Sequence, residues 1–190
     1  MKNKDFITGK VPITKEEVRA ISLNKLELLN AKTFIDVGAG TGSVSIEAGY
    51  SYPNLKVIAI ERNDDAIDLV KQNKEKFNLD NVEIIKAYAP VELDKDIKAD
   101  AIFLGGTGKK LEEIIDWSKD LLVDGGRLVA NFIIIDTFYE MLRLVKEKGF
   151  KNIDVTVLKL EKLGTGEYFK PHNPIYIISC EKGVEEDNEY

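Results

Sequence analysis

The chain has 190 residues, and its 27 Lys and Arg residues against 33 Asp and Glu residues give a net charge of −6. Its 44% hydrophobic and 32% charged residues exclude a disordered chain, and its acidic balance excludes a protein whose main role is to bind nucleic acid. No apolar stretch approaches the roughly 20 residues of a membrane helix, and the single cysteine, Cys180, excludes an internal disulfide. We therefore expect a cytoplasmic protein with one domain over residues 1–182 and an acidic, disordered tail over residues 183–190.

Apolar residues follow two different periods along the chain, which predicts that helices alternate with short strands. The segment over residues 14–29 carries Val18, Ile21 and Leu26 at helical spacing, and Thr14 and Glu17 have the spacing of a capping box. The predicted helices cover residues 14–29, 43–49, 64–77, 111–122 and 137–148. The predicted strands cover residues 33–37, 56–60, 82–85, 101–104, 127–135, 153–160 and 174–180.

This order of elements predicts the fold class. Short apolar strands that are separated by helices pair in parallel, with helices on both faces of the sheet. No helical pattern separates the last two strands, so these should pair antiparallel. We therefore expect an α/β protein with a doubly wound, mostly parallel, seven-stranded sheet whose last strand is antiparallel, a Rossmann-like fold. Ligands bind to such sheets outside the carboxyl ends of the strands.

Three glycines, Gly38, Gly40 and Gly42, stand between the first strand and the next helix. Glycine lets the backbone turn tightly and lie against a ligand without a Cβ in the way; an ordinary strand-to-helix turn is the alternative. A dinucleotide-binding loop would have its third small residue at Ser43, whereas this loop is G-x-G-x-G. It resembles the loop of the class I S-adenosylmethionine-dependent methyltransferases. The resemblance implies that S-adenosylmethionine is the co-substrate and that it contacts Gly38, Ala39, Gly40, Thr41 and Gly42.

Two acidic residues accompany the glycine loop. Glu61 follows the second strand, about 20 residues beyond the glycines, where a carboxylate can accept the hydroxyls of a ribose; the alternative is a solvent-exposed acid paired with Arg62. Asp36 is a buried acid that needs partners, either amides of its own loop or the ammonium group of the donor. The class I resemblance implies that it mainly organises the loop, so we expect a supporting role and no direct contact with the donor. The class I resemblance also places the turn over residues 86–90 along the adenine, with Ala89 as a contact.

The acceptor side of the site carries fewer signals. The segment over residues 100–108 ends in a glycine-rich turn. This turn lacks the aromatic residue on which nucleic-acid methyltransferases stack a flipped base. No cluster of His, Asp and Glu indicates a catalytic metal ion. Asn131 is a polar residue within an apolar strand, where its amide is costly unless it is paired. We therefore expect Asn131 to face the ligand crevice.

Several segments are more specific than the glycine loop. They are Val11-Pro-Ile-Thr-Lys-Glu-Glu-Val-Arg19, Phe103-Leu-Gly-Gly-Thr107, Gly125-Gly-Arg-Leu-Val-Ala-Asn131 and His172-Asn-Pro-Ile-Tyr-Ile-Ile178. Residues 36–47 and 59–63, which form the donor half of the site, complete the pattern. Together these segments resemble the decarboxylating cobalt-precorrin-6B C15-methyltransferases of cobalamin biosynthesis. The resemblance extends over residues 6–179.

This resemblance implies an enzyme that uses S-adenosylmethionine to methylate C15 of a precorrin, a reduced tetrapyrrole, and removes CO₂ from the acetate of ring C. It implies a cytoplasmic homotetramer and, because some organisms fuse this activity to a C5-methyltransferase, a C5-methyltransferase as partner. It also implies that Thr14 reaches over the donor and that Gly105, Gly106 and Asn131 lie beside the acceptor. The family often has an acidic residue near position 88, where this chain has Tyr88.

A precorrin carries many carboxylates, so local cations must attract it to an acidic protein. The candidates that flank the site are Lys15, Arg19, Lys109, Lys110, Lys162, Lys170 and His172, although each could be an ordinary surface charge. Other functions stay open. They are a methyltransferase acting on another small molecule or a protein residue, a nucleotide-binding module without catalysis, and a dehydrogenase, which Ser43 disfavours.

Overall fold

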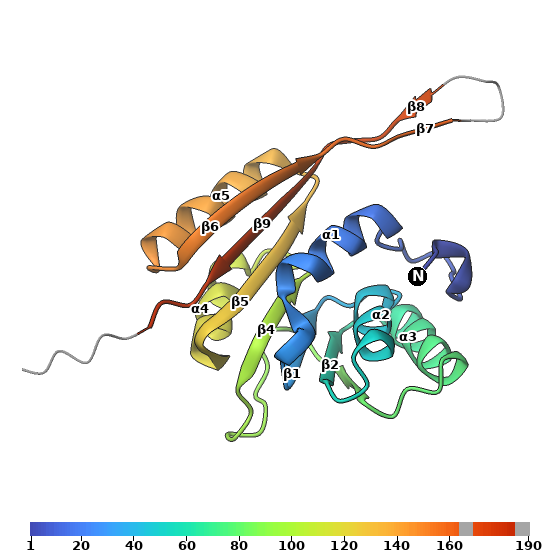
Figure 1. The fold of residues 1–190 in the computed structure, drawn as a ribbon, viewed down its shortest axis with the longest axis horizontal. Helices are drawn as coiled ribbons and strands as arrows, with labels where there is room; N and C mark the ends of the chain where they lie inside the picture. Colours follow the sequence, from blue (N-terminus) through green and yellow to red (C-terminus); the bar gives the residue numbers. More distant parts are fainter. Residues whose placement is uncertain (164–168, 185–190) are drawn as a thin grey trace, which may run out of the picture.

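The computed structural model describes residues 1–163 and 169–184; residues 185–190 of the expected tail lie outside the described residues. A seven-stranded sheet in the order β3-β2-β1-β4-β5-β9-β6 forms the centre of this part of the chain (Figure 1). Its strands are β1 (Thr33–Val37), β2 (Lys56–Glu61), β3 (Val82–Lys86), β4 (Ala99–Leu104), β5 (Leu122–Phe132), β6 (Lys151–Leu158) and β9 (Ile175–Glu181). Neighbouring strands from β3 to β5 are parallel, whereas β9 lies antiparallel between β5 and β6. The predicted fold class is confirmed.

Helices cover both faces of this sheet (Figure 1). One layer contains α1 (Glu16–Leu26), α2 (Ser43–Ser51) and α3 (Asp64–Lys76), and the other contains α4 (Leu111–Leu121) and α5 (Ile135–Glu147). Short 3-10 turns, η1 (Asn3–Asp5) and η2 (Leu28–Asn30), flank α1. Parallel strands need a long crossover connection. Here α2, α3 and α4 provide three of these connections, and residues 87–98, which contain no helix, lead from β3 to β4.

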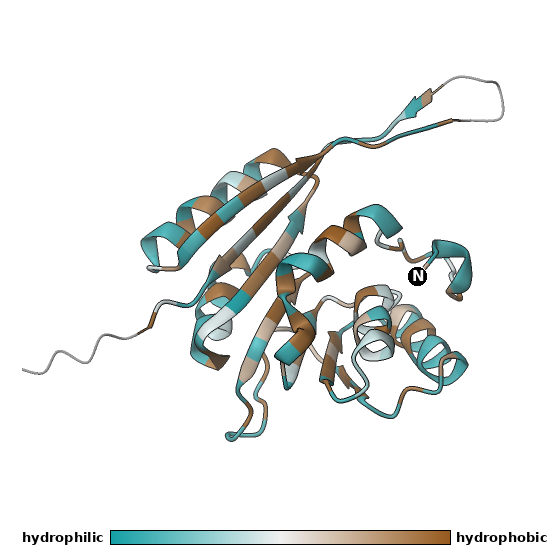
Figure 2. Ribbon diagram, viewed as in Figure 1, coloured by the Kyte–Doolittle hydropathy of each residue, from teal (hydrophilic) through white to brown (hydrophobic). Residues whose placement is uncertain are grey.

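Successive residues of the buried strands face opposite helix layers. In β1, Phe34 packs in the cluster that contains Val44 of α2, and Ile35 packs in the cluster that contains Met141 of α5. Figure 2 shows the same division, with hydrophobic residues along the central strands and hydrophilic residues on the outer faces of the helices. Burial on both faces removes apolar surface from water and fixes the strand register, so the carboxyl ends of the strands are held rigidly.

The predicted capping box at the start of the first helix is wrong. The N-cap of α1 is Lys15, without a side-chain cap. Glu17 instead pairs with Lys162 at 2.6 Å, and the Thr14 carbonyl oxygen accepts a hydrogen bond from Arg19 Nη1 at 2.6 Å. The helix also ends earlier than predicted, at Leu26, because Glu27 takes up the left-handed conformation with φ 51°.

The predicted strand over residues 127–135 extends too far at its end. β5 stops at Phe132, which pairs with Tyr176 near the start of β9, so the chain beyond it has no strand to pair with. Ile135 then opens α5. As a result Ile133 and Ile134 are 64% and 59% exposed at the carboxyl edge of the sheet.

A two-stranded antiparallel ribbon between β6 and β9 was not predicted. It consists of β7 (Glu161–Leu163) and β8 (Phe169–Pro171). All of its described residues are exposed, so no alternation of buried and exposed positions marks these strands in the sequence. The ribbon projects away from the sheet, past α1 (Figure 1).

Candidate functional site

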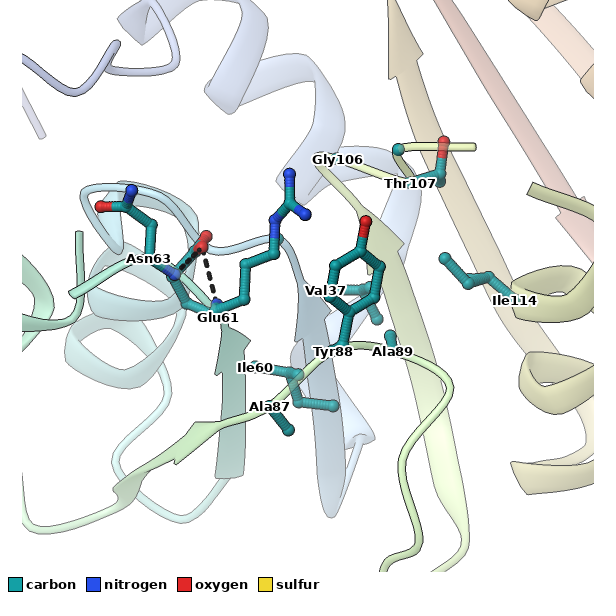
Figure 3. Close-up of a pocket in the computed structure, with 13 residues that line it drawn as sticks. Val37, Ile60, Glu61, Asn63, Ala87, Tyr88, Ala89, Gly106, Thr107 and Ile114 are labelled. Atoms are coloured by element: carbon teal, nitrogen blue, oxygen red, sulfur yellow. Dashed lines mark hydrogen bonds between the residues drawn. The ribbon is translucent and has the colours of Figure 1, made fainter. Parts of the chain in front are cut away.

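Two cavities open at the carboxyl ends of the parallel strands, one on either side of the glycine loop over residues 38–42. The first, here called the Glu61 cavity, has a volume of about 630 Å³ and is lined by Glu61, Arg62, Ala87, Tyr88, Ala89, Gly106 and Thr107, among others (Figure 3). The second, the Asn131 cavity, has a volume of about 590 Å³ and is lined by Thr14, Lys15, Ala39, Gly40, Thr41, Gly105, Asn131 and His172, among others. Gly38 lines both. The site is therefore double, with the glycine loop at its centre.

Close contact between two turns separates the cavities. A Cβ on Gly38 would lie 2.7 Å from the Gly106 carbonyl oxygen, and Gly38 has φ +73°. The amides of Gly105 and Gly106 both donate to the Val37 carbonyl oxygen, at 2.9 and 3.3 Å. No side chain fits at Gly38, so this glycine is required by the packing of the two turns as well as by its backbone conformation.

The other two loop glycines have different surroundings. Gly42 has φ +74°, and a Cβ there would lie 2.8 Å from Val70 of α3. Gly40 has φ +58°, but its nearest neighbours, in Val11 and Pro12, would be 3.8 Å from a Cβ. Among these three loop glycines, therefore, only Gly40 has room for a side chain, which would occupy part of the Asn131 cavity without displacing protein atoms.

Glu61 holds the glycine loop from the end of β2. It is 9% exposed. Its Oε2 accepts a hydrogen bond from the Gly40 amide at 2.9 Å, and its Oε1 accepts from the amides of Arg62 and Asn63 at 2.7 and 2.9 Å. Figure 3 shows the carboxylate at one end of the cavity with its bonds from the Arg62 and Asn63 amides. An ionised carboxylate has about four acceptor positions, so Glu61 retains capacity for a ligand hydroxyl.

Asp36 is the second acid at the loop, and it is 1% exposed. Its Oδ2 accepts from the amide and the hydroxyl of Ser45 in the first turn of α2, which caps that helix. Its Oδ1 is buried and has no hydrogen-bond partner within the described part of the chain, and Asp36 is one of the residues that line the Asn131 cavity. Burial and, to a smaller extent, the Glu61 charge raise the pKa of the Asp36 carboxyl from 3.8 to about 7, against the lowering effect of the hydrogen bonds from Ser45.

Tyr88 lines the Glu61 cavity (Figure 3), and two cationic side chains lie near its ring. The Arg62 guanidinium lies 4.5 Å from the centre of its ring, and the Lys110 ammonium lies 5.4 Å from it. Ala89, next in the chain, is buried. The turn after β3 thus offers a flat, partly apolar wall with an aromatic ring at its edge.

Asn131 is held in the second cavity by a buried hydroxyl. Its Nδ2 lies 2.9 Å from Ser22 Oγ, which donates to the Val18 carbonyl oxygen at 2.8 Å. Because the Ser22 proton is used within α1, the Asn131 amide group donates to Ser22, and this fixes the side chain. Asn131 is therefore paired, as expected, and it lines a cavity at the carboxyl ends of the strands.

Arg19 is not one of the cations at the mouth of the site, which corrects the prediction. It is 0% exposed and forms an ion pair with Glu47 of α2. Its guanidinium also lies 4.8 Å from the centre of the Phe6 ring. Lys15 and His172 do line the Asn131 cavity.

Residues 6–182 match the family of precorrin methyltransferase domains. The chain belongs to this family. It is 46% identical over 186 residues, 96% of each chain, to the cobalt-precorrin-6B C(15)-methyltransferase (decarboxylating) of Salmonella typhimurium. The family resemblance predicted from the sequence is thereby confirmed.

Solved structures agree with this membership of the precorrin methyltransferase family. The precorrin-6y C5,15-methyltransferase from Geobacter metallireducens superposes with a TM-score of 0.89 at 38% identity, covering 96% of this chain and 97% of that chain. The precorrin 8w decarboxylase from Methanobacterium thermoautotrophicum superposes with a TM-score of 0.85 at 30% identity, covering 97% and 100%.

In this member of the precorrin methyltransferase family the predicted site residues divide between the two cavities. Glu61, Ala89 and Gly106 line the Glu61 cavity; Thr14, Ala39, Gly40, Thr41, Gly105 and Asn131 line the Asn131 cavity; Gly38 lines both. Gly42 lines neither, and instead serves as the N-cap of α2. Gly106 is thus on the same side as Glu61 and not beside Asn131.

Sequence reasoning missed Ser22 and Asn73, two buried polar residues that hold site segments in place. Asn73 follows Ile67 and Val70 at three-residue spacing on the buried face of α3, so a polar residue on an apolar helix face was the available signal. Among the described residues, no group of three or more His, Cys, Asp or Glu could hold a metal ion. None of the described helices combines the length and apolarity that crossing a membrane requires.

The raised pKa of Asp36 makes the stability of the fold pH-dependent. The folded protein keeps this carboxyl protonated up to about pH 7, whereas the unfolded chain ionises it near its ordinary value. The contribution of the Asp36 carboxyl to the free energy of unfolding should be complete below about pH 4 and should be lost as the pH rises to about 7. We expect the free energy of unfolding in urea, relative to that of Asp36→Asn, to fall across this range. Parallel pH profiles for the two proteins would contradict the assignment.

Proposed function

We propose that this chain transfers a methyl group from S-adenosylmethionine to C15 of a cobalt-precorrin or precorrin and removes CO₂ from the acetate of ring C. The observation that carries this proposal is the 46% identity, along 96% of both chains, to the Salmonella enzyme of that name. The two adjoining cavities support it, because one can take the nucleoside half of the donor and the other its amino-acid end together with the acceptor.

The Glu61 cavity suits the nucleoside half of the donor. Glu61 is oriented to accept a ribose hydroxyl, and the wall formed by Ala87 and Ala89 suits the flat face of an adenine. The glycine loop, with Ala39 and Thr41, leads from there into the Asn131 cavity. Asp36 Oδ1 fits an ammonium group, because this buried oxygen has no partner within the described residues and a cation beside it would stabilise its charge.

The Asn131 cavity suits a broad, flat, polyanionic acceptor. Its floor is the Gly105 turn, and the exposed Ile133 beside it offers an apolar surface for a ring face. Lys15 and His172 line the same cavity and can pair with peripheral carboxylates. Asn131, fixed by Ser22, can donate to or accept from a polar group of the ring. We propose that Thr14 on the opposite wall covers the donor.

When bound, S-adenosylmethionine supplies a methyl group on a positively charged sulfur, which an acceptor carbon displaces in line. The residues of this chain contribute alignment and the exclusion of water. Alignment alone can account for roughly 7–11 kcal/mol of a barrier. In this proposal the reacting groups meet in the Asn131 cavity beside Gly38 and Gly105, two residues that have no side chain to intervene.

The activity can be tested with purified protein, S-adenosylmethionine labelled on its methyl group, and cobalt-precorrin-6B or precorrin-6B. We expect a product that carries one labelled methyl group and has lost CO₂. Donor binding without any transfer would favour the alternative of a non-catalytic nucleotide-binding module, and transfer only to other small molecules or proteins would favour a different methyltransferase.

Gly40 allows a test of the donor site with a matched control. Gly40→Ala and Gly149→Ala both place a side chain at a positive φ, +58° and +75°, and each should cost about 1–2 kcal/mol of stability. Only Gly40 faces the cavity, so only Gly40→Ala should weaken binding of S-adenosylhomocysteine, by about tenfold or more. Calorimetry that shows equal affinity for both variants would place the donor elsewhere.

Asn131 should act on the acceptor and not on the donor. Loss of one hydrogen bond is worth about 0.5–1.5 kcal/mol, so Asn131→Ala should lower kcat/KM for the precorrin by roughly three- to tenfold while donor affinity stays unchanged. The exposed Asn24 of α1, replaced by Ala, serves as the control. Equal turnover of wild type and Asn131→Ala would show that the acceptor does not contact this residue.

We propose that the working form is a cytoplasmic homotetramer, with a separate C5-methyltransferase as its partner in the same biosynthesis. The support is a set of exposed apolar residues on the edge strand β6 and the ribbon: Val155, Val157, Leu163 and Phe169 are 39%, 50%, 65% and 64% exposed. An unpaired apolar edge strand favours association with another chain.

Light scattering coupled to gel filtration tests the tetramer. We expect about four times the 21.3 kDa mass of one chain, and a smaller species for Val157→Asp, since a buried unpaired charge opposes association. Val184, which is 70% exposed and lies outside this set, provides the control Val184→Asp. A wild-type protein that elutes as a monomer would refute the proposed assembly.

A further inference from the structure

An extended segment before α1 forms one wall of the site. Residues 7–15, here called the strap, include Val11, Pro12 and Thr14, which line the Asn131 cavity opposite the glycine loop. The Pro12 carbonyl oxygen and a Val11 methyl group lie within 3.8 Å of the position that a Cβ on Gly40 would occupy. The strap therefore lies directly over the loop that the donor would contact.

Few apolar contacts hold the strap in place. Ile13 packs against the core cluster that contains Phe6 and Val18, but every strap residue is exposed or only partly buried. A segment that buries so little apolar surface cannot be fixed by the hydrophobic effect alone. Its position must depend on polar interactions with the body of the protein.

Asn73 of α3 supplies those interactions at the start of the strap. Its Oδ1 accepts a hydrogen bond from the Ile7 amide at 2.7 Å, and its Nδ2 donates to the Ile7 carbonyl oxygen at 3.0 Å and to the Thr41 carbonyl oxygen at 3.1 Å. Asn73 is 0% exposed, and Thr41 is 1% exposed. One buried amide group thus joins the strap to the glycine loop.

Arg19 holds the other end of the strap. Its Nη1 donates to the Thr14 carbonyl oxygen at 2.6 Å, and its ion pair with Glu47 fixes the guanidinium against α2. Both ends of the strap are therefore held by buried polar side chains, on the same side of the molecule as α2 and α3 (Figure 1).

We propose that Asn73 is a positioning residue for the donor site, which holds the strap and the glycine loop at the spacing that donor binding requires. This inference rests on the proposed function. Asn73 touches no ligand and acts through Ile7 and Thr41. If loss of the Asn73 side chain leaves the strap in its place over the glycine loop for only one tenth of the time, the apparent Kd for the donor rises about tenfold.

Asn81 provides a matched control for a test. Its Nδ2 donates to three backbone carbonyl oxygens, those of Gly49, Tyr52 and Leu55, at 3.1, 3.3 and 2.9 Å. These bonds lie at the amino ends of the strands, away from both cavities. Asn81→Ala therefore removes a comparable set of hydrogen bonds without touching the strap.

The experiment measures the Kd for S-adenosylhomocysteine by calorimetry and the hydrogen exchange of strap amides in wild type, Asn73→Ala and Asn81→Ala. We expect Asn73→Ala to raise the Kd about tenfold and to speed exchange over residues 7–15, and Asn81→Ala to change neither. Ile7→Pro removes the amide that donates to Asn73, together with the Ile7 side chain, while it leaves α3 intact. It should act in the same direction as Asn73→Ala.

Wild-type affinity in Asn73→Ala or in Ile7→Pro would overturn the inference, as would an equal loss of affinity in Asn81→Ala, since that would reflect general destabilisation. A wild-type protein that does not bind S-adenosylhomocysteine would refute the proposed function instead, and the role of Asn73 with it.

Discussion

The site depends on a buried carboxylate at the end of β1. Asp36 uses one oxygen to cap α2 through Ser45 and leaves the other without a partner among the described residues. A buried acid in this position is costly unless it is neutral or paired, and its pKa of about 7 reflects that cost. Glu61, from the next strand, fixes the same loop through the Gly40 amide. Two acids thus hold one short loop, and the second oxygen of Asp36 is what a cationic ligand group would complete.

Close packing of glycines gives the site its two compartments. Because Gly38 and Gly106 leave no room for a Cβ at Gly38, the turns after β1 and β4 meet backbone to backbone, with one cavity on each side. The parallel strands that carry these turns are buried on both faces, which makes their ends a rigid support. The strap, which forms a wall of the Asn131 cavity, comes from a segment with little burial.

The sequence predicted the fold because apolar strands and amphipathic helices have strong periodic signals. It also pointed to residues that line the two cavities, because Gly38, Gly40 and Glu61 fall at strand ends. It failed where neighbours decide the outcome. The residues after Phe132 are as apolar as a strand, but β9 offers no further pairing. The ribbon has no buried positions to mark it. Arg19 is charged and yet wholly buried, because Glu47 and the Phe6 ring lie against it. Pairing partners of this kind are brought together only by the fold.

The central claim is that the unpartnered oxygen of Asp36 receives the ammonium group of the methyl donor. The most direct measurement is the heat of S-adenosylhomocysteine binding at pH 7 in two buffers of different ionisation enthalpy. Since Asp36 is then about half protonated and an adjacent cation favours its charged form, we expect release of roughly half a proton on binding. Binding of S-adenosylhomocysteine to Asp36→Asn should release no proton. Binding of 5′-methylthioadenosine to the wild-type protein should release none either, because this compound lacks the ammonium group. Equal heats in both buffers for the wild-type protein would contradict the account.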